Sequence, residues 1–264
     1  MKKQYWERDN RIDDADSALL PAPADISSGI PNDINHQTKK IMGKLVDYKE
    51  LRMIYACAMK EIKTKFDILN TEFSLQYNRN PINSIQSRLK STASIVDKLA
   101  KLHQTVDIEH IDEHIHDIAG VRVICSYIDD VYLVANALLK QDDITLITRN
   151  DYIENPKENG YRSLHLIVKV PVFLSEHRLE MEVEVQLRTV AMDFWASLEH
   201  QLRYKTDFDG KEELVQELSR CAETINKTDN EMMQIRCHLE ELTDIPTEEE
   251  ILLRRMKKLD TPIE

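Results

Sequence analysis

The stretch "RLEMEVEVQLRT" at residues 178–189 alternates between two kinds of side chain. Apolar residues occupy every second position, and the positions between them hold Glu180, Glu182, Glu184, Gln186 and Arg188. This period of two predicts a half-buried β-strand, because successive side chains of a strand point to opposite faces. One face therefore carries carboxylates, an amide and a guanidinium, which either meet water or bind a charged ligand.

Basic side chains recur in groups that suit the binding of phosphates. The chain has only 5 glycines, and none lies in a GxxxxGK or GxGxxG pattern, so a glycine-rich loop of backbone amides is excluded as the phosphate site. Guanidinium and ammonium side chains must then bind the phosphates, although each one taken singly is also an ordinary surface charge. The candidates are Arg88, Lys90, Lys98, Arg122, Arg149, Lys157 and Arg162.

A long loop, "RNDYIENPKENGYRS", precedes another predicted strand and ends near Gly160 and Tyr161. An aromatic face at the mouth of a strand can stack on a nucleobase, and a tyrosine that only meets solvent is the alternative. From Tyr161 onward the same strand face presents Ser163, His165 and Lys169. The sequence thus indicates a second polar row beside the first.

Two carboxylates are candidates for a metal site. Asp117 precedes a predicted strand near Gly120, and Glu184 lies in the 178–189 strand. If these strands are neighbours, the pair offers hard oxygen ligands for Mg²⁺ beside bound phosphates, and an exposed face of paired charges is the alternative. The run "EHIDEHIHD" also resembles part of a metal-dependent phosphohydrolase site, but the separate histidine and aspartate that such a site requires are not apparent.

These residues need helices and strands to position them. Helical spacing of apolar residues predicts one long or two broken helices over residues 36–77. Further helices are expected with caps at Ser91, at Asp129 or Asp130, and at Thr189, the last with an apolar face that includes Ala191, Phe194, Trp195, Leu198 and Leu202.

Strands are expected at residues 121–128, 144–148, 163–172 and 178–189, with a short extended piece at 82–90. The expected fold class is therefore α/β, with a mixed sheet flanked by helices and with helical extensions at both ends. Residues 1–35, which contain "PAPADISSGIP", are expected to be a flexible extension, and residues 36–205 to form the folded domain.

The last part of the chain, residues 206–264, is expected to be helical. Its apolar residues follow spacings of 4 and 3 in turn: Leu214, Leu218, Cys221, Ile225, Thr228, Met232, Ile235, Leu239 and Leu242, with Thr228 as the polar exception. Such a heptad seam needs a partner, which is either the chain's own N-terminal helices or another subunit. Thr247 and Glu250 form a capping-box pair that opens a last short helix.

Bulk composition excludes several classes of protein. With 264 residues, 42% hydrophobic and 31% charged, the chain is an ordinary globular sequence. It has no apolar run near the roughly 20 residues that span a bilayer and no signal-peptide core, so a cytoplasmic protein is expected. Its 4 cysteines form no close pair, which suits a reducing compartment. A net charge of −12 does not indicate RNA or DNA binding, although local basic clusters leave it open.

Three segments together, "HDIAGVRVIC", "ENGYRSLHLIV" and "EVEVQLRTVAMDFWASLEHQLRYK", resemble the synthetase domain of RelA/SpoT homologues, in particular the single-domain small alarmone synthetases. The resemblance covers about residues 40–205 in order. It implies a nucleotidyltransferase-like sheet and transfer of pyrophosphate from ATP to the 3′-hydroxyl of GDP or GTP, which yields ppGpp or pppGpp and AMP.

Residue roles follow from the resemblance by position. It implies that Arg88 and Arg122 hold the adenine and that Lys90 and Lys98 meet the ATP phosphates. Asp117 and Glu184 would bind Mg²⁺, with Glu184 at the reacting hydroxyl, and Tyr161 would stack on guanine. Residues near the acceptor nucleotide would be Arg149, Lys157, Arg162, His165 and Gln186. The family's helical assemblies favour a homotetramer. Alternatives are a related enzyme acting on a tRNA 3′ end, or a non-catalytic oligomer that senses nucleotides or RNA.

Overall fold

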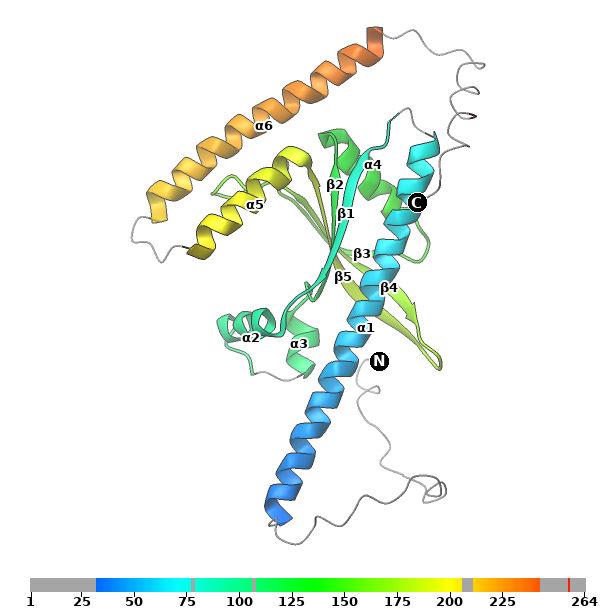
Figure 1. The fold of residues 1–264 in the computed structure, drawn as a ribbon, viewed down its shortest axis with the longest axis vertical. Helices are drawn as coiled ribbons and strands as arrows, with labels where there is room; N and C mark the ends of the chain where they lie inside the picture. The colour runs from blue at the N-terminus through cyan, green and yellow to red at the C-terminus, as the bar shows by residue number, and fades with distance from the viewer. Residues whose placement is uncertain (1–31, 77–78, 106–107, 206–210, 243–255, 257–264) are drawn as a thin grey trace. The chain divides into compact units, whose positions relative to one another are not determined.

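The computed structural model describes residues 32–76, 79–105, 108–205, 211–242 and 256 (Figure 1). The chain divides into two units, Met1–Leu45 and Val46–Glu264, and only the first part of one helix belongs to the first unit. Residues 1–31 of the predicted flexible extension lie outside the described residues. The predicted capping pair of Thr247 and Glu250 also lies outside them. Among the described residues, no helix is both long enough and apolar enough to cross a membrane.

Helices and strands are interspersed along the chain. The helices are α1 (Asn32–Gln76), α2 (Thr92–Lys101), α3 (Ile108–His114), α4 (Ile128–Leu139), α5 (Val190–Lys205) and α6 (Lys211–Leu242). The strands are β1 (Ile82–Leu89), β2 (Ala119–Cys125), β3 (Thr145–Asp151), β4 (Leu164–Phe173) and β5 (Arg178–Thr189). For residues 36–77 the sequence predicted either one long helix or two broken helices. The structure has one helix, α1, which begins at Asn32, four residues earlier than expected.

The strands form one 5-stranded sheet in the order β1-β2-β5-β4-β3. The central pair, β2 and β5, is parallel, and the other pairs are antiparallel. A parallel pair needs a long crossover, which the chain between β2 and β5 supplies through α4, β3 and β4. The predicted α/β class with a mixed sheet flanked by helices is confirmed.

One face of the sheet is the hydrophobic core. The apolar positions of β5, from Met181 to Leu187, are buried in one cluster with residues of α1, such as Ile62 and Phe66, and of α4, such as Leu138. A buried leucine or phenylalanine stabilises the fold by about 1.5 to 3 kcal/mol. This burial fixes the register of β5, because a shift of one residue would move its carboxylates into the core.

Helix caps agree with the sequence at two of three positions. The Ser91 hydroxyl accepts a hydrogen bond from the Ser94 N–H at 3.2 Å, and the Thr189 hydroxyl accepts one from the Met192 N–H at 3.1 Å. The cap predicted for α4 is wrong, because the helix begins one turn earlier with Tyr127 as its N-cap. Asp130 instead lies inside the first turn, where it accepts the Tyr127 N–H and pairs with Arg79 at 2.6 Å.

Helices α5 and α6 lie side by side (Figure 1) and pack through a small cluster around Trp195, Ala196 and Ala222. The Trp195 indole donates a hydrogen bond to the Leu218 carbonyl at 3.1 Å. The apolar face predicted for α5 is only partly correct, because Phe194 is 58% exposed and Leu198 and Leu202 are also exposed. Contact with α6 buries the side of α5 that carries Trp195 and Ala196 instead.

A carboxylate is buried where α6 meets the end of β5. Asp229 of α6 is 6% exposed, and its Oδ2 accepts a hydrogen bond from the Thr189 hydroxyl at 2.6 Å. Burial raises the pKa of Asp229 above its ordinary value, although the Thr189 hydrogen bond acts in the opposite direction. Folding therefore favours the protonated carboxyl.

The substitution Asp229→Asn should remove a pH dependence of stability. The contribution of Asp229 is complete below its ordinary pKa of 3.8 and is lost as pH rises through the raised folded-state pKa. The free energy of unfolding of the variant should therefore equal or exceed that of the parent at neutral pH, and the difference should shrink in acid. Denaturant titrations across this range check it, and a variant that is less stable only at neutral pH would contradict the assignment.

Candidate active site

The second face of the sheet is polar and carries most of the residues with candidate roles. Strand register places Arg122 between Gln86 on one side and Gln186 on the other. In the next row, Gly120 lies between Arg88 and Glu184. Since Gly120 has no side chain, the space between the guanidinium and the carboxylate stays open.

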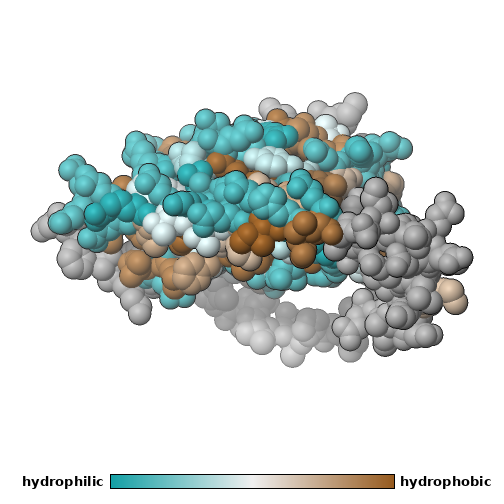
Figure 2. Space-filling model, turned by 90° about the horizontal axis from the view of Figure 1, so that it is seen from above, coloured by the Kyte–Doolittle hydropathy of each residue, from teal (hydrophilic) through white to brown (hydrophobic). Residues whose placement is uncertain are grey.

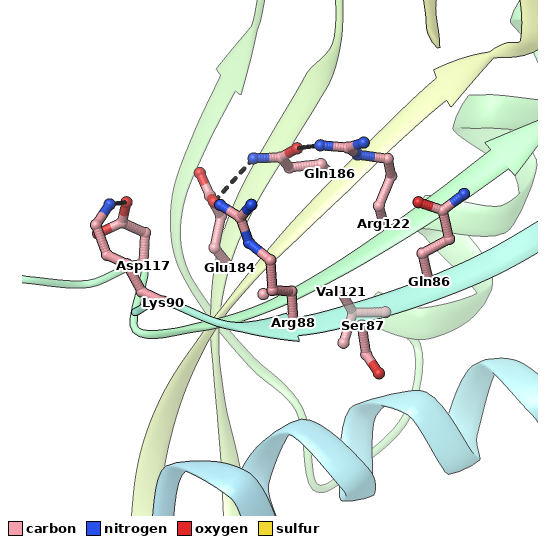
Figure 3. Close-up of a pocket in the computed structure, with 10 residues that line it drawn as sticks. Gln86, Ser87, Arg88, Lys90, Asp117, Val121, Arg122, Glu184 and Gln186 are labelled. Carbon is pink, nitrogen blue, oxygen red and sulfur yellow. Dashed lines mark hydrogen bonds and ion pairs between the residues drawn. The ribbon is translucent and has the colours of Figure 1, made fainter. Parts of the chain in front are cut away.

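These rows line a cavity of about 380 Å³. Figure 3 shows Arg88, Arg122, Glu184 and Gln186 projecting from their strands to the same side, and Asp117 beside Lys90 at one end. The lining residues are Gln86, Ser87, Arg88, Lys90, Asp117, Gly120, Val121, Arg122, Glu184 and Gln186. The prediction that the strand after Asp117 lies beside the strand of Glu184 is confirmed by the β2–β5 pairing, and Asp117 itself lies in the turn before β2.

Two lysines surround Asp117. Its two carboxylate oxygens accept hydrogen bonds from Lys90 Nζ at 2.6 Å and from Lys98 Nζ at 2.7 Å. Burial alone would raise the pKa of Asp117, but the hydrogen bonds and charges of both lysines outweigh it and hold that pKa below its ordinary value. Asp117 is therefore an ionised carboxylate with cations already assembled around it.

Glu184 is also held as a carboxylate. His165 Nδ1 lies 3.1 Å from its Oε1, and Gln186 Nε2 donates to its Oε2 at 2.9 Å. Burial raises the pKa of Glu184 and the charge of Asp117 adds to this, yet hydrogen bonding to His165 and Gln186 lowers the pKa below its usual value overall. The side chain can therefore accept a proton or bind a cation.

Tyr161 joins this face to a second cavity. Its hydroxyl lies 2.8 Å from His165 Nε2, and Lys157 Nζ lies 5.0 Å from the centre of its ring. Burial raises the pKa of Tyr161, so the phenol keeps its proton. The second cavity measures about 630 Å³ and is lined by Pro156, Lys157, Glu158, Asn159, Tyr161, Glu199 and Val215.

The structure brings together most, but not all, of the predicted site residues. Lys98 and His165 do not line the first cavity themselves but bind its carboxylates, and Lys157 joins Tyr161 at the second cavity. Arg149 instead pairs with Asp151 at 3.2 Å, and Arg162 donates to the Ile153 carbonyl at 2.9 Å. Neither arginine is among the residues that line the two cavities.

Several polar residues of the site were not singled out from the sequence. Arg188 is 4% exposed and binds Gln186, Tyr161 and Asp193. Its position in the alternating row of β5, two residues after Gln186, was a signal that could have found it. Glu199 accepts a buried hydrogen bond from Asn159 at 3.1 Å, and nothing in the spacing of the sequence indicates that contact.

Known proteins resemble this chain over the same region. The family model described as the region found in RelA / SpoT proteins matches residues 87–209. GTP pyrophosphokinase YwaC of Bacillus subtilis is 44% identical over 190 residues, which is 72% of this chain and 90% of that protein.

Solved structures agree in fold. The small alarmone synthetase 2 from Bacillus subtilis aligns with a TM-score of 0.66 and 43% identity, over 73% of this chain and 99% of that one. The small alarmone synthetase 1 from the same organism, bound to its product pppGpp, aligns with a TM-score of 0.68 and 33% identity, over 74% and 98% of the two chains.

The fold of this chain, a mixed sheet flanked by helices, matches the fold of these structures over about three quarters of the chain. The chain belongs to the RelA/SpoT family, among its small alarmone synthetases. The resemblance read from the sequence is confirmed.

The loop that carries Tyr161 depends on a close approach to α6, which yields a prediction. Gly160 has a φ of 87°, and a Cβ there would lie 2.4 Å from Ala222 Cβ and 3.1 Å from Ser219 Cα. Gly160→Ala should lower the free energy of unfolding by about 1 to 3 kcal/mol, through backbone strain and this overlap. Denaturant titration measures the loss.

Two further variants test the cause. Ala222→Gly relieves the overlap with the Ala222 methyl but itself costs about 0.5 to 1 kcal/mol inside α6, so the double variant with Gly160→Ala should lose less stability than the sum of the two single losses. Gly43→Ala, at an exposed helical position with nothing within 4 Å of a built Cβ, should instead raise stability by about 0.5 to 1 kcal/mol. Equal effects at both glycines would contradict the proposed contact.

Proposed function

We propose that the chain is a (p)ppGpp synthetase, which transfers the β,γ-pyrophosphate of ATP to the 3′-hydroxyl of GDP or GTP and so serves the stringent response. The observation that carries this proposal is the pair of ionised carboxylates, Asp117 and Glu184, that line one cavity with Arg88, Lys90 and Arg122. Relatives that are 44% and 35% identical to this chain are named GTP pyrophosphokinases.

ATP is assigned to the first cavity. Arg88 and Arg122 hold the adenine between them, since a guanidinium plane stacks well on an aromatic ring. Lys90 and Lys98 bind the phosphates, and both lysines meet at Asp117 in the chain without nucleotide. A lysine that exchanges the Asp117 carboxylate for a phosphate keeps an anionic partner. Phosphate binding therefore costs little desolvation of the two lysines.

Mg²⁺ is assigned to Asp117 and Glu184. Two hard oxygen donors from the protein, completed by phosphate oxygens, fit the way this ion is held in nucleotide sites. Two protein carboxylates leave the further coordination positions of the ion to phosphate oxygens of the nucleotide and to water. When bound, the ion would neutralise charge that develops on the transferred phosphates.

The acceptor nucleotide is assigned to the Tyr161 side. Its guanine stacks on the Tyr161 ring, and Lys157, already 5.0 Å from that ring, faces the acceptor's phosphates. Arg149 and Arg162 are assigned to the same phosphates on the resemblance alone, and each would first leave its contact with Asp151 or the Ile153 carbonyl. His165 and Gln186 line the space between, through their contacts with Glu184.

The reaction is an in-line displacement at phosphorus. The 3′-oxygen of the acceptor forms a bond to the β-phosphorus of ATP, the bond from that phosphorus to the α-phosphate oxygen breaks, and AMP leaves. Glu184 accepts the proton of the attacking hydroxyl. The cations around Asp117 offset the repulsion between two polyphosphates, so positioning and charge carry the catalysis.

The names of the relatives favour a guanine nucleotide over a tRNA 3′ end as the acceptor. Retention of both carboxylates speaks against a sensor without catalysis, and the net charge of −12 does not indicate RNA as a partner. We assign the enzyme to the cytoplasm, where its nucleotide substrates are. Residues 36–205 are assigned to catalysis, and 206–264 to assembly.

Glu184→Gln should abolish product formation while leaving the fold intact. The amide keeps the shape of the side chain and the alternation of β5 but removes the charge that accepts the proton, a loss expected to be at least about 10²-fold in kcat. Purified parent and variant are incubated with ATP, Mg²⁺ and GDP or GTP, and the nucleotides are separated.

The parent should form ppGpp or pppGpp and AMP. A parent that turns over ATP without a guanine tetra- or pentaphosphate product would refute the proposed function. A Glu184→Gln variant within a few-fold of the parent would leave the function standing but remove Glu184 from its role.

A homotetramer is the proposed assembly, with α6 at an interface. Within the described residues α6 packs on α5 around Ala222, yet side chains in the second half of the heptad seam are exposed, with Met232 at 49% and Ile235 at 60% exposure. Figure 2 shows a face that is largely hydrophilic, with hydrophobic patches among the polar side chains. Covering an exposed seam is favourable at about 25 cal/mol per Å² of apolar area.

Ile235→Glu should shift the protein to smaller assemblies, because it places a charge inside the seam. The matched control is Gln234→Glu, which adds the same charge at the neighbouring exposed position outside the seam and should leave the assembly unchanged. Light scattering at micromolar concentration measures both. A parent that is monomeric, or two variants that behave alike, would contradict the role of the seam.

A further inference from the structure

Five side chains of the site form a closed ring of hydrogen bonds. Glu184 Oε1 lies 3.1 Å from His165 Nδ1, and His165 Nε2 lies 2.8 Å from the Tyr161 hydroxyl. Arg188 Nη2 donates to that hydroxyl at 2.8 Å and to Gln186 Oε1 at 2.9 Å. Gln186 Nε2 donates to Glu184 Oε2 at 2.9 Å, which returns the ring to its start.

The chemistry of the end groups gives this ring its direction. A guanidinium only donates, and the two hydrogens of Arg188 Nη2 go to Tyr161 and to Gln186. The Glu184 carboxylate only accepts, so Nδ1 of His165 carries a hydrogen and donates it. In the neutral imidazole, Nε2 is then the acceptor of the Tyr161 hydroxyl hydrogen.

The second branch runs in the same direction. Gln186 accepts from Arg188 through Oε1, so its amide nitrogen must face Glu184. Both branches therefore begin at Arg188 and end on a different oxygen of the Glu184 carboxylate. The tautomer of His165 follows from the Glu184 carboxylate, and the orientation of the Gln186 amide follows from Arg188, with Arg122 donating to the same Gln186 oxygen at 3.4 Å.

Arg188 is built into the protein rather than into the cavity wall. It is 4% exposed, and its other terminal nitrogen binds Asp193 Oδ1 at 3.1 Å, which supplies a counter-charge. The guanidinium carbon of Arg188, Cζ, lies 5.3 Å from the centre of the Tyr161 ring. A buried cation is costly unless it is paired and hydrogen-bonded, so its presence at this point calls for a role.

We propose that Arg188 is a positioning residue that directs both hydrogen-bond branches onto Glu184 and ties that carboxylate to the ring of Tyr161. The inference rests on the proposed function, in which Tyr161 holds the guanine and Glu184 meets the 3′-hydroxyl of the same nucleotide. Arg188 itself touches neither substrate. Its effect is to fix the distance and orientation between the group that binds the base and the group that accepts the proton.

The proposal separates two properties of Tyr161. The aromatic face serves binding, whereas the hydroxyl serves the ring. Tyr161→Phe keeps the face but removes both hydrogen bonds of the hydroxyl, to His165 and to Arg188, so kcat should fall about tenfold or more, while the KM for GDP changes less than about twofold. Tyr152→Phe is the matched control, since this neighbouring ring lies edge-on to Tyr161 and His165 outside the hydrogen-bonded ring, and it should keep the parental kcat.

Arg188→Lys opens both branches at once, because a single ammonium on a shorter reach does not reproduce the fork of donors. It should lower kcat about tenfold or more with a small change in the KM for GDP. The double variant Arg188→Lys with Tyr161→Phe should be no worse than Arg188→Lys alone, because both changes break the same ring. Binding of GDP by calorimetry gives a readout that does not depend on turnover.

The outcomes distinguish this inference from the function on which it rests. A parent that forms no ppGpp overturns the proposed function. An active parent whose Tyr161→Phe variant keeps the parental kcat, or loses only GDP affinity, overturns the ring while the function stands, and so do additive losses in the double variant. If Arg188→Lys does not fold, the comparison of Tyr161→Phe with Tyr152→Phe decides.

Discussion

The parallel pairing of β2 with β5 is the constraint on which the site depends. It sets Gly120 beside Glu184 and Arg122 beside Gln186, so a cation, an open space and a carboxylate come from neighbouring strands. The pairing is itself held by the other face of β5, where Val183, Val185 and Leu187 are fully buried. A slip in register would cost that burial, so the core keeps the polar rows aligned.

Charge is distributed over the polar face so that it can receive anions. Asp117 holds Lys90 and Lys98 together, and this preorganisation lowers the cost of assembling cations around phosphates. At the other end, Arg188 is enclosed and paired with Asp193. The half-buried lysines at the cavity are thus suited to binding, whereas the buried arginine is suited to holding neighbouring groups in place.

Much of this architecture could be predicted from the sequence, because strands buried on one face have a period that can be read directly. Strand β5 has the predicted bounds, and Ser91 and Thr189 are caps as expected. The predictions that were wrong or missing concern residues whose positions depend on contacts with parts of the chain that are distant in the sequence. The short helix α3 was not predicted, Asp130 was taken for a cap although Arg79 binds it, and Phe194 was placed on a buried face although α6 covers the opposite side of α5. The hydrogen-bonded ring joins residues 161–165 to residues 184–188, and only the fold brings those segments together.

The central claim is that pyrophosphate moves as one unit from ATP to the acceptor. The most direct measurement uses ATP labelled either at the β- or at the γ-phosphorus, in parallel reactions with GDP, followed by separation of the nucleotides. The account predicts that both labels enter the guanine product to the same extent and that unlabelled AMP forms in equal amount. Transfer of the γ-label alone, with formation of ADP, would contradict it.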